Sequence, residues 1–311
     1  MSLRIGVVGA GGFGRAIAQA SARNGHEVLV WSRKDRELPG SIRTSTDIQD
    51  IQSRELIFLA VPARHAAEAA GQLGTVVDGR HLMVHISRGL VGAELKTITQ
   101  VVREKTVCRR LGALAGPLLA DALAEGRPSG AILGTRFPEL TRLVREAIGG
   151  SGLRIYETTD VVGVELASAT VGFLTVMLAY AQEVGVDPST LAVLATRGIV
   201  EVSRIGQTLG AKESTFMGLA GLGDLIAAVA GDQRPESRLG RALAKGVDLT
   251  NAIGEAGAYV EGIEVASHLI EHARRLGLET PISSTFVALS EGRISREDAI
   301  EALMERDVGK E

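Results

Sequence analysis

The chain has 311 residues, a net charge of −3, 45% hydrophobic residues and only 3% aromatic residues. This length predicts two domains, with cores built mainly from Ala, Val, Leu and Ile. The nearly balanced charge excludes the basic surface that nucleic acids or anionic membranes require. Cys108 is the only cysteine, which excludes a disulfide within the chain and a cysteine-rich metal site, and we expect no metal.

The amino terminus runs from Met1 into an apolar strand without the layout of a signal peptide. No uncharged run reaches the ~18 residues that a membrane-spanning helix needs. The sequence therefore predicts a cytoplasmic protein that does not insert into a membrane.

The first half of the chain alternates short β-branched runs with helical stretches. This alternation predicts an α/β Rossmann fold, a parallel, doubly wound sheet with helices on both faces. Strands are expected at Arg4–Val8, Glu27–Trp31, Leu56–Ala60, His81–Ile86, Arg109–Ala113, Ser129–Gly134 and Leu153–Thr158. Helices are expected between them, for example at Gly12–Asn24, Ala63–Leu73 and Pro138–Ile148.

The character of the sequence changes near Asp160, where helix-length apolar segments replace the strands. These segments are 161–185, 188–210, 217–230, 237–245, 249–256, 262–276, 282–290 and 295–306. Glycine and proline residues separate them, as expected at helix ends. We therefore predict a dinucleotide-binding domain over 1–158 and an all-α domain over 159–311, with the substrate in the crevice between them.

A glycine-rich turn directly follows the first predicted strand. Gly9, Gly11 and Gly14 match G-x-G-x-x-G, and Gly12 and Phe13 complete the turn that opens an alanine-rich helix. The first glycine permits the tight turn, the second lets the backbone approach a pyrophosphate, and the third lets helix and strand pack closely. The pattern predicts a nicotinamide dinucleotide on the positive end of this helix.

The end of the second strand bears on the choice of cofactor. An NAD-selective site usually carries an acidic residue there for the ribose 2′-hydroxyl. Here Ser32 and Arg33 follow Trp31. The guanidinium of Arg33 can meet a 2′-phosphate or stack on adenine, or it can be a solvated loop charge. We expect NAD or NADP as cofactor, with NADP tolerated and the preference left open.

Several segments follow one another with a recognisable spacing along almost the whole chain. They are SRG (87–89), AGPLLADALAEGRPSGA (115–131), GVEL (163–166), ATRGIVEVSRIGQTLGA (195–211), TFMGLAGLGDL (215–225), VEG (260–262) and HARRLGLETPI (272–282). Together they closely resemble the bacterial-type NAD(P)-dependent glycerol-3-phosphate dehydrogenases. The resemblance implies reversible hydride transfer between NAD(P)H and C2 of dihydroxyacetone phosphate, giving sn-glycerol 3-phosphate. By analogy of fold it also implies a homodimer.

The resemblance implies roles for particular residues. The candidate catalytic residues are Asp224 and Arg88. Arg88 occupies the position of the lysine in the family's S-K-G segment. The same two residues and Gly116 are the candidates for contacting a small, phosphorylated substrate. Candidates for binding the cofactor are Gly9, Gly11, Gly12, Phe13, Gly14, Arg33, Arg88, Ala120, Arg234 and Glu261.

The sequence departs from the family at the chemical centre. The family's proton donor is the lysine of GVEL-x-x-A-x-K-N, and the two last positions of that motif hold Val171 and Gly172. A valine can neither donate a proton nor bind a phosphate. No lysine occurs between Lys105 and Lys212, so a local shift cannot replace it.

Other family positions also differ. The threonine four residues past the aspartate is Ala228, the phenylalanine after the S-G-P motif is Leu119, and the S-R-N triplet reads Arg234-Pro235-Glu236. Arg234 can supply a shifted cation. These departures leave a second hypothesis open, a catalytically impaired NAD(P)-binding pseudoenzyme or sensor.

Three candidates have structural alternatives. Without the lysine, a buried Asp224 needs a partner such as Arg88 or Arg197 or must be protonated, and the structural alternative is that it caps the next helix. His85 lies near the end of a strand and can serve as a replacement acid or be a core histidine. Glu261 matches an acidic family residue near the nicotinamide, and its alternative is a surface position.

Overall fold

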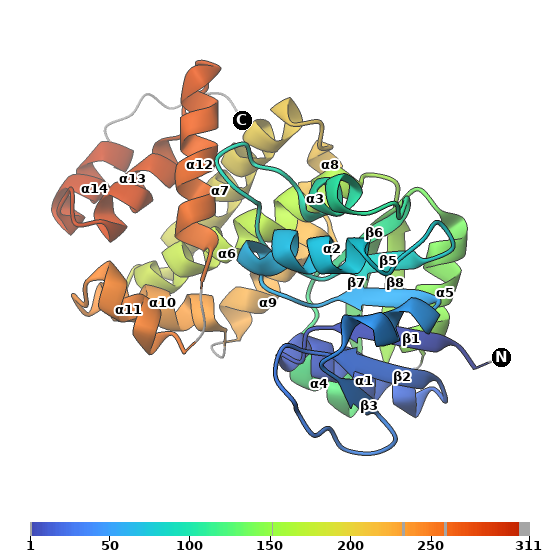
Figure 1. Ribbon diagram of the computed structural model, residues 1–311. Helices are drawn as coiled ribbons and strands as arrows, with labels where there is room; N and C mark the ends of the chain where they lie inside the picture. The colour runs from blue at the N-terminus through green and yellow to red at the C-terminus, as the bar shows by residue number, and fades with distance from the viewer. Residues whose placement is uncertain (1, 151, 232–233, 258–259, 305–311) are drawn as a thin grey trace.

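The computed structural model describes residues 2–150, 152–231, 234–257 and 260–304. Figure 1 shows a sheet flanked by helices on one side of the molecule and a group of helices on the other. The sheet has eight strands in the order β3-β2-β1-β4-β5-β6-β7-β8. Their bounds are β1 Arg4–Val8, β2 Glu27–Trp31, β3 Arg43–Ser45, β4 Leu56–Leu59, β5 Leu82–His85, β6 Arg110–Ala115, β7 Ser129–Thr135 and β8 Leu153–Thr158.

Helices cover both faces of this sheet, as the sequence predicts. They are α1 Gly12–Arg23, α2 Ala66–Gly74, α3 Ile98–Lys105, α4 Ala120–Glu125 and α5 Pro138–Ile148. Side chains alternate between the faces along each strand. Ile5 and Val7 of β1 pack in a cluster with α1 and α5, whereas Val8 packs in a second cluster with α2 and α3. The doubly wound fold therefore follows from apolar strands that are buried on both sides.

The prediction that the sheet is wholly parallel is wrong at one strand pair. β6 and β7 are antiparallel, so β7 and β8, which are parallel to each other, run opposite to the other strands. The only helix between β6 and β7 is α4, with 6 residues. Such a helix spans ~9 Å, whereas a strand of this length spans ~20 Å. The short α4 cannot carry the chain back across the sheet, and β7 returns directly beside β6.

Two short elements lie where the sequence predicts none. β3, of 3 residues, pairs with β2 at the edge of the sheet, and the 3-10 helix Ile48–Ser53 precedes β4. β3 contains no large apolar residue, so hydrophobic periodicity gives no signal for it. A second 3-10 helix, Ala63–His65, leads into α2.

The rest of the described chain is helical, as predicted. The helices are α6 Val161–Glu183, α7 Pro188–Thr208, α8 Glu213–Phe216, α9 Asp224–Ala230, α10 Pro235–Ala244, α11 Leu249–Glu255, α12 Gly262–Arg275, α13 Pro281–Ser290 and α14 Arg296–Met304. The expected single helix over 217–230 is instead a π-helical turn, Leu219–Gly223, followed by α9. At Gly221 a Cβ would overlap the carbonyl oxygen of Phe216, so close backbone packing requires glycine in this turn.

α6 is the central element of the helical part. It and the segment Glu213–Ala230 are long and apolar enough to cross a membrane by length and composition, but 89% of the α6 window is buried inside the protein. Its neighbours include α7, α10 and α12, and it also contacts β6 and β7. Burial in the core therefore accounts for its apolar sequence.

Gly240 sets the distance between α6 and α10. A Cβ on Gly240 would overlap the carbonyl oxygen of Val176 and lie 2.9 Å from the Cβ of Ala179. We predict that Gly240→Ala lowers the free energy of unfolding by about 2 kcal/mol or more, because backbone must move to relieve the overlap. Gly254→Ala in α11 is the control, since a Cβ there meets no atom within 4 Å. The control should change stability by about 1 kcal/mol at most, and towards higher stability. Urea unfolding of both variants checks this, and equal effects would contradict it.

Candidate functional site

The glycine turn has the geometry that a dinucleotide fingerprint requires. Gly9 has a φ of +113°, and a Cβ there would overlap the carbonyl oxygen of Ala60. A Cβ on Gly14 would overlap the carbonyl oxygen of Gly9. These two glycines therefore serve the turn and the close packing of β1, α1 and β4.

Gly11 is different, because a Cβ there would meet no protein atom within 4 Å. Gly11 is the N-cap of α1, which has no side-chain cap and no acidic residue in its first turn. The backbone N–H groups at this helix end are thus available to an anion, and the dipole of the helix favours negative charge. The residues present fit the pyrophosphate of a nicotinamide dinucleotide.

The loops at the carboxyl ends of the parallel strands bring the predicted residues to one edge of the sheet. Gly9 follows β1, Arg33 follows β2, Arg88 follows β5, and Gly116 follows β6. A small cavity lies here between the sheet and the helical part. It is lined by Phe13, Ile86, Arg88, Leu114, Ala115, Gly116, Leu118 and Ser168. This edge is where ligands bind in doubly wound sheets.

Asp224 is the centre of a buried charge cluster. Its side chain is fully buried. The Oδ2 of Asp224 lies 2.9 Å from the Nη2 of Arg88, and its Oδ1 accepts a hydrogen bond from the Nη2 of Arg234 at 2.7 Å. The partner expected from the sequence was Arg88 or Arg197, and the structure has Arg88 together with Arg234. Asp224 is the first residue of α9 but makes no capping hydrogen bond, so the capping alternative is wrong.

The cluster is electrostatically coupled to a second carboxylate. Burial alone would lower the pKa of Arg88, but the charges of Asp224 and Glu236 and the hydrogen bond that Arg88 donates to Asp224 raise it. Arg88 therefore stays charged. Within the described part of the chain, the Nη1 of Arg234 is buried without a hydrogen-bond partner. A buried guanidinium nitrogen of this kind is suited to a ligand atom, since leaving it unpaired is costly.

The residues at the positions of the family's lysine and asparagine cannot donate a proton from a side chain. Val171 is fully buried in the hydrophobic core of the helical part. At Gly172 an added Cβ would lie 3.9 Å from the Oε1 of Glu236 and 3.9 Å from the Cα of Gly262. A hydrocarbon side chain and a glycine thus stand where the resemblance implies a cation and an amide, and the carboxylate of Glu236 lies beside the glycine.

Glu261 joins the helical part to the loops of the sheet. Its Oε1 accepts a hydrogen bond of 3.0 Å from the backbone N–H of Arg64. Its Oε2 is so close to Gly89, which has a φ of +128°, that a Cβ there would overlap it. Burial raises the pKa of Glu261, although the hydrogen bond and charge of Arg64 oppose this. Glu261 is therefore half-buried between the helical part and the loops of the sheet.

Arg33 and Ala120 lie at the outer parts of this edge. The side chain of Arg33 is 61% exposed, and its Nη1 is 3.9 Å from a carboxylate oxygen of Glu68. Such an exposed pair contributes little and leaves the guanidinium free to meet a ligand. Ala120 begins α4, and its Cβ lies 4.0 Å from the place where Gly12 would carry a Cβ. Both positions are compatible with contact to a dinucleotide.

His85 forms a buried pair that the sequence does not predict. Its Nε2 lies 2.9 Å from the Oε1 of Glu165 in α6, and the same oxygen accepts a hydrogen bond from the N–H of Thr99 at 2.8 Å. The side chains of His85 and Glu165 are 5% and 1% exposed. His85 therefore links β5 to α6 in the interior, as in the core alternative. Glu165 belongs to the GVEL segment, but nothing in that motif alone indicates its partner.

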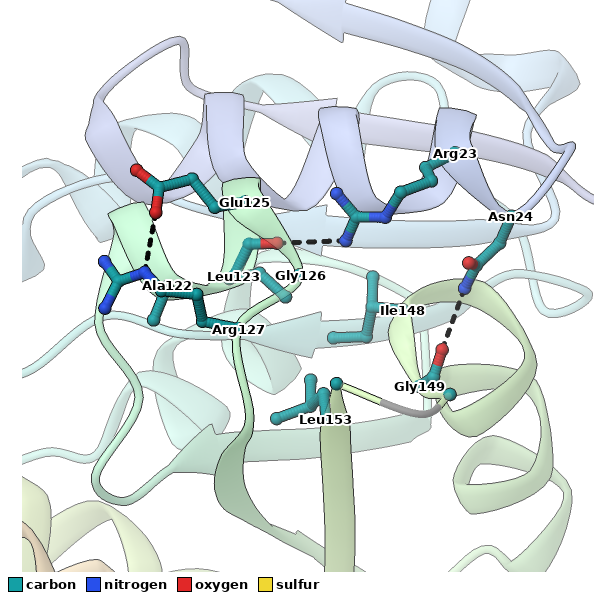
Figure 2. A pocket seen from close by; sticks show the side chains of 12 residues that line it. Arg23, Asn24, Ala122, Leu123, Glu125, Gly126, Arg127, Ile148, Gly149 and Leu153 are labelled. Carbon is teal, nitrogen blue, oxygen red and sulfur yellow. Dashed lines mark hydrogen bonds and ion pairs between the residues drawn. The ribbon is translucent and has the colours of Figure 1, made fainter.

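A larger cavity of about 230 Å³ lies away from this edge, at the carboxyl end of α1 (Figure 2). The guanidinium of Arg23 donates to the carbonyls of Leu123 and Ala124 at 3.0 and 2.6 Å. The Nδ2 of Asn24 donates to the carbonyl of Gly149 at 2.9 Å. These bonds satisfy carbonyl groups at the ends of α4 and α5. We therefore interpret the residues around this cavity as connecting the end of α1 to α4 and α5.

Comparison with known proteins supports the same family along the chain. The family model described as NAD-dependent glycerol-3-phosphate dehydrogenase C-terminus matches residues 160–301, and the corresponding N-terminus model matches 4–38 and 32–140. The glycerol-3-phosphate dehydrogenase [NAD(P)+] of Dechloromonas aromatica is 33% identical, with 99% of each chain covered. That of Azorhizobium caulinodans is 33% identical over 97% of each. The solved glycerol-3-phosphate dehydrogenase of Coxiella burnetii has a TM-score of 0.90 at 24% identity, covering 98% of this chain and 99% of that one.

The open space at Gly11 gives a test of cofactor binding. We predict that Gly11→Ala still folds and lowers the free energy of unfolding by about 1 kcal/mol at most, because the new methyl group meets no protein atom and alanine is only a poorer N-cap. The methyl group would occupy the approach to the pyrophosphate, so the Kd of NADH and NADPH should rise about tenfold or more. Gly71→Ala in α2, where a Cβ also meets nothing within 4 Å, is the matched control. Fluorescence titration checks the prediction, and equal affinities in the two variants would contradict it.

The raised pKa of Glu261 predicts a pH-dependent stability. Its ordinary pKa is 4.5, and the folded protein binds this proton more readily than the unfolded chain. Ionised Glu261 therefore lowers the free energy of unfolding above pH 4.5, fully so above its folded pKa, and has no such effect below 4.5. Glu261→Gln keeps an acceptor for Arg64, so it should raise Tm at neutral pH.

This gain should disappear as the pH falls to about 4. Thermal unfolding across the pH range measures it, with the exposed Glu291→Gln as control. A gain that is the same at all pH values would contradict the prediction.

Proposed function

Since the chain belongs to the NAD-dependent glycerol-3-phosphate dehydrogenase family, we propose that it transfers a hydride reversibly between NAD(P)H and C2 of dihydroxyacetone phosphate or a closely related small ketone. The observation that carries the proposal is the placement of the Arg88–Asp224–Arg234 cluster beside the cavity of the glycine turn. An oxidoreductase of this family needs a nicotinamide held against a carbonyl and cations around the substrate.

The residues of the chain divide this work between them. The nicotinamide cofactor, when bound, supplies or accepts the hydride. The N–H groups beginning at Gly11 hold its pyrophosphate. Phe13, Leu114 and Leu118 give the cavity an apolar lining that excludes water. Arg88 lines the same cavity and stabilises the negative charge that develops on the substrate oxygen.

Asp224 acts through the two arginines. Its buried carboxylate holds Arg88 and Arg234 by charge-assisted contacts, so that both guanidinium groups have fixed orientations. We therefore assign Asp224 a positioning role. Arg88 cannot give up its proton under ordinary conditions, so the alkoxide must take a proton from another donor. The loss of a positioned proton donor slows such a reaction by about 10²–10⁴-fold.

The residues after β2 bear on the choice between NAD and NADP. Ser32 and Arg33 follow Trp31, and Asp35 is the first acidic residue after the strand. We propose that Arg33 lets the site accept the 2′-phosphate of NADP as well as the hydroxyl of NAD. NADH binding at least tenfold tighter than NADPH would contradict this assignment.

We propose a cytoplasmic homodimer without membrane insertion that acts on a small, phosphorylated or related substrate and binds no nucleic acid. We place the boundary between the two domains after Thr158, where β8 ends shortly before α6 begins. A second candidate function, a nucleotide-binding sensor without turnover, is favoured by one observation, the buried Val171 at the donor position.

An assay at high enzyme concentration tests the proposal. NADPH or NADH is mixed with dihydroxyacetone phosphate, and the loss of the reduced nicotinamide absorbance is followed. We expect turnover about 10²–10⁴-fold slower than that of a relative with the lysine. Binding of the cofactor without turnover of any small ketone would contradict the proposal and favour the sensor.

A restoring variant accompanies this assay. Val171→Lys with Gly172→Asn should recover only part of the activity, because Ala228 and Pro235 remain. The buried site of Val171 also makes the new charge costly, so the variant should have a lower Tm. Full recovery would show that only the donor is missing.

A further inference from the structure

The charges at the cleft cancel within the cluster that we describe. Arg88 and Arg234 contribute two positive charges, and Asp224 and Glu236 contribute two negative ones. Val171 and Gly172 add none. These four side chains therefore leave no surplus positive charge for an anionic substrate. A site that binds a phosphate dianion normally has such a surplus.

Glu236 is held in this position by its helix. It lies in the first turn of α10, directly after Pro235 at the start of the helix. α10 packs tightly on α6, because Gly240 lies against the backbone of Val176. This contact fixes the end of α10 beside Gly172, and the Oε1 of Glu236 lies 3.9 Å from the place of a Gly172 Cβ.

The carboxylate of Glu236 is not engaged by another side chain or by backbone in the described residues. It is half-buried, and it makes no hydrogen bond or ion pair within 4 Å to any residue in the described ranges. Its negative charge nevertheless reaches Arg88, where it helps to raise the pKa of the guanidinium. A half-buried carboxylate that no described residue pairs with is a suitable acceptor for a hydroxyl group and repels a phosphate.

We propose that Glu236 determines substrate specificity, so that the site takes a small ketone or secondary alcohol whose far end carries a hydroxyl group in place of a phosphate. The proposal rests on the hydride-transfer function proposed above and narrows its substrate class. A neutral hydroxyl can donate to Glu236, and the buried Nη1 of Arg234 has a hydrogen bond to give in the same cluster. A phosphate dianion would give the group of four side chains and the ligand a net charge of about −2, with the carboxylate of Glu236 uncompensated.

The test compares neutral dihydroxyacetone with dihydroxyacetone phosphate. For each ketone, kcat/KM is measured with NADPH in the wild type, in Glu236→Gln and in Glu291→Gln. Glu291 is an exposed acid at the end of α13, outside the cleft, and gives the same change in net charge. We expect the wild type to prefer dihydroxyacetone by about tenfold or more.

Glu236→Gln should remove most of this preference. It should raise kcat/KM for dihydroxyacetone phosphate by about tenfold, mainly through KM, while the Kd of NADPH changes by about twofold at most. Glu291→Gln should leave the ratio of the two substrates unchanged. A wild type that prefers the phosphate, or equal shifts in the two variants, would overturn the proposal.

A binding measurement keeps the proposal testable if no ketone is turned over. Calorimetry on the NADPH-bound protein compares glycerol 3-phosphate binding in the wild type and in Glu236→Gln. The proposal predicts binding about tenfold tighter in the variant, and equal affinities would overturn it. Failure of the hydride-transfer function appears as cofactor binding without turnover, whatever the calorimetry shows, so the two failures are distinguishable.

Discussion

The cleft depends on one buried carboxylate that holds two arginines from different parts of the chain. Asp224 begins α9, Arg88 follows β5 in the sheet, and Arg234 precedes α10. A buried carboxylate is costly unless its charge is compensated, so the fold must bring both guanidinium groups to it. The same contact fixes the sheet against the helical part at the edge where the glycine turn lies. Structure and candidate function therefore share one interaction.

The cofactor end of the cleft matches the family pattern, whereas the chemical end departs from it. At the glycine turn, Gly9 and Gly14 are required by backbone contacts, and Gly11 leaves space for a pyrophosphate. At the chemical end, the position of the family's lysine is a core valine, Val171, and Glu236 adds a negative charge. Cofactor binding needs mainly backbone geometry, whereas substrate choice depends on the sign of a few side chains. The second can change without disturbing the first.

Much of the fold could be predicted from local patterns, because strands buried on both faces and amphipathic helices have clear periodicities. The antiparallel direction of β7 could not be predicted from local patterns, because it depends on the short length of α4. The site shows the same limit. The sequence indicates that Asp224 needs a cation, but only packing decides that Arg234 shares this role with Arg88 and that Arg197 does not. The pairing of His85 with Glu165 is likewise a contact between distant segments.

The coupling free energy between Arg88 and Asp224 tests most directly whether the buried carboxylate depends on this arginine. A double-mutant cycle with Arg88→Gln, Asp224→Asn and the double variant gives it from urea unfolding. We expect the double variant to lose about 2 kcal/mol less than the sum of the single losses, because either change alone leaves a buried charge with less compensation. Losses that add to within about 0.5 kcal/mol would show that the two side chains act independently, and would contradict the central role of this contact.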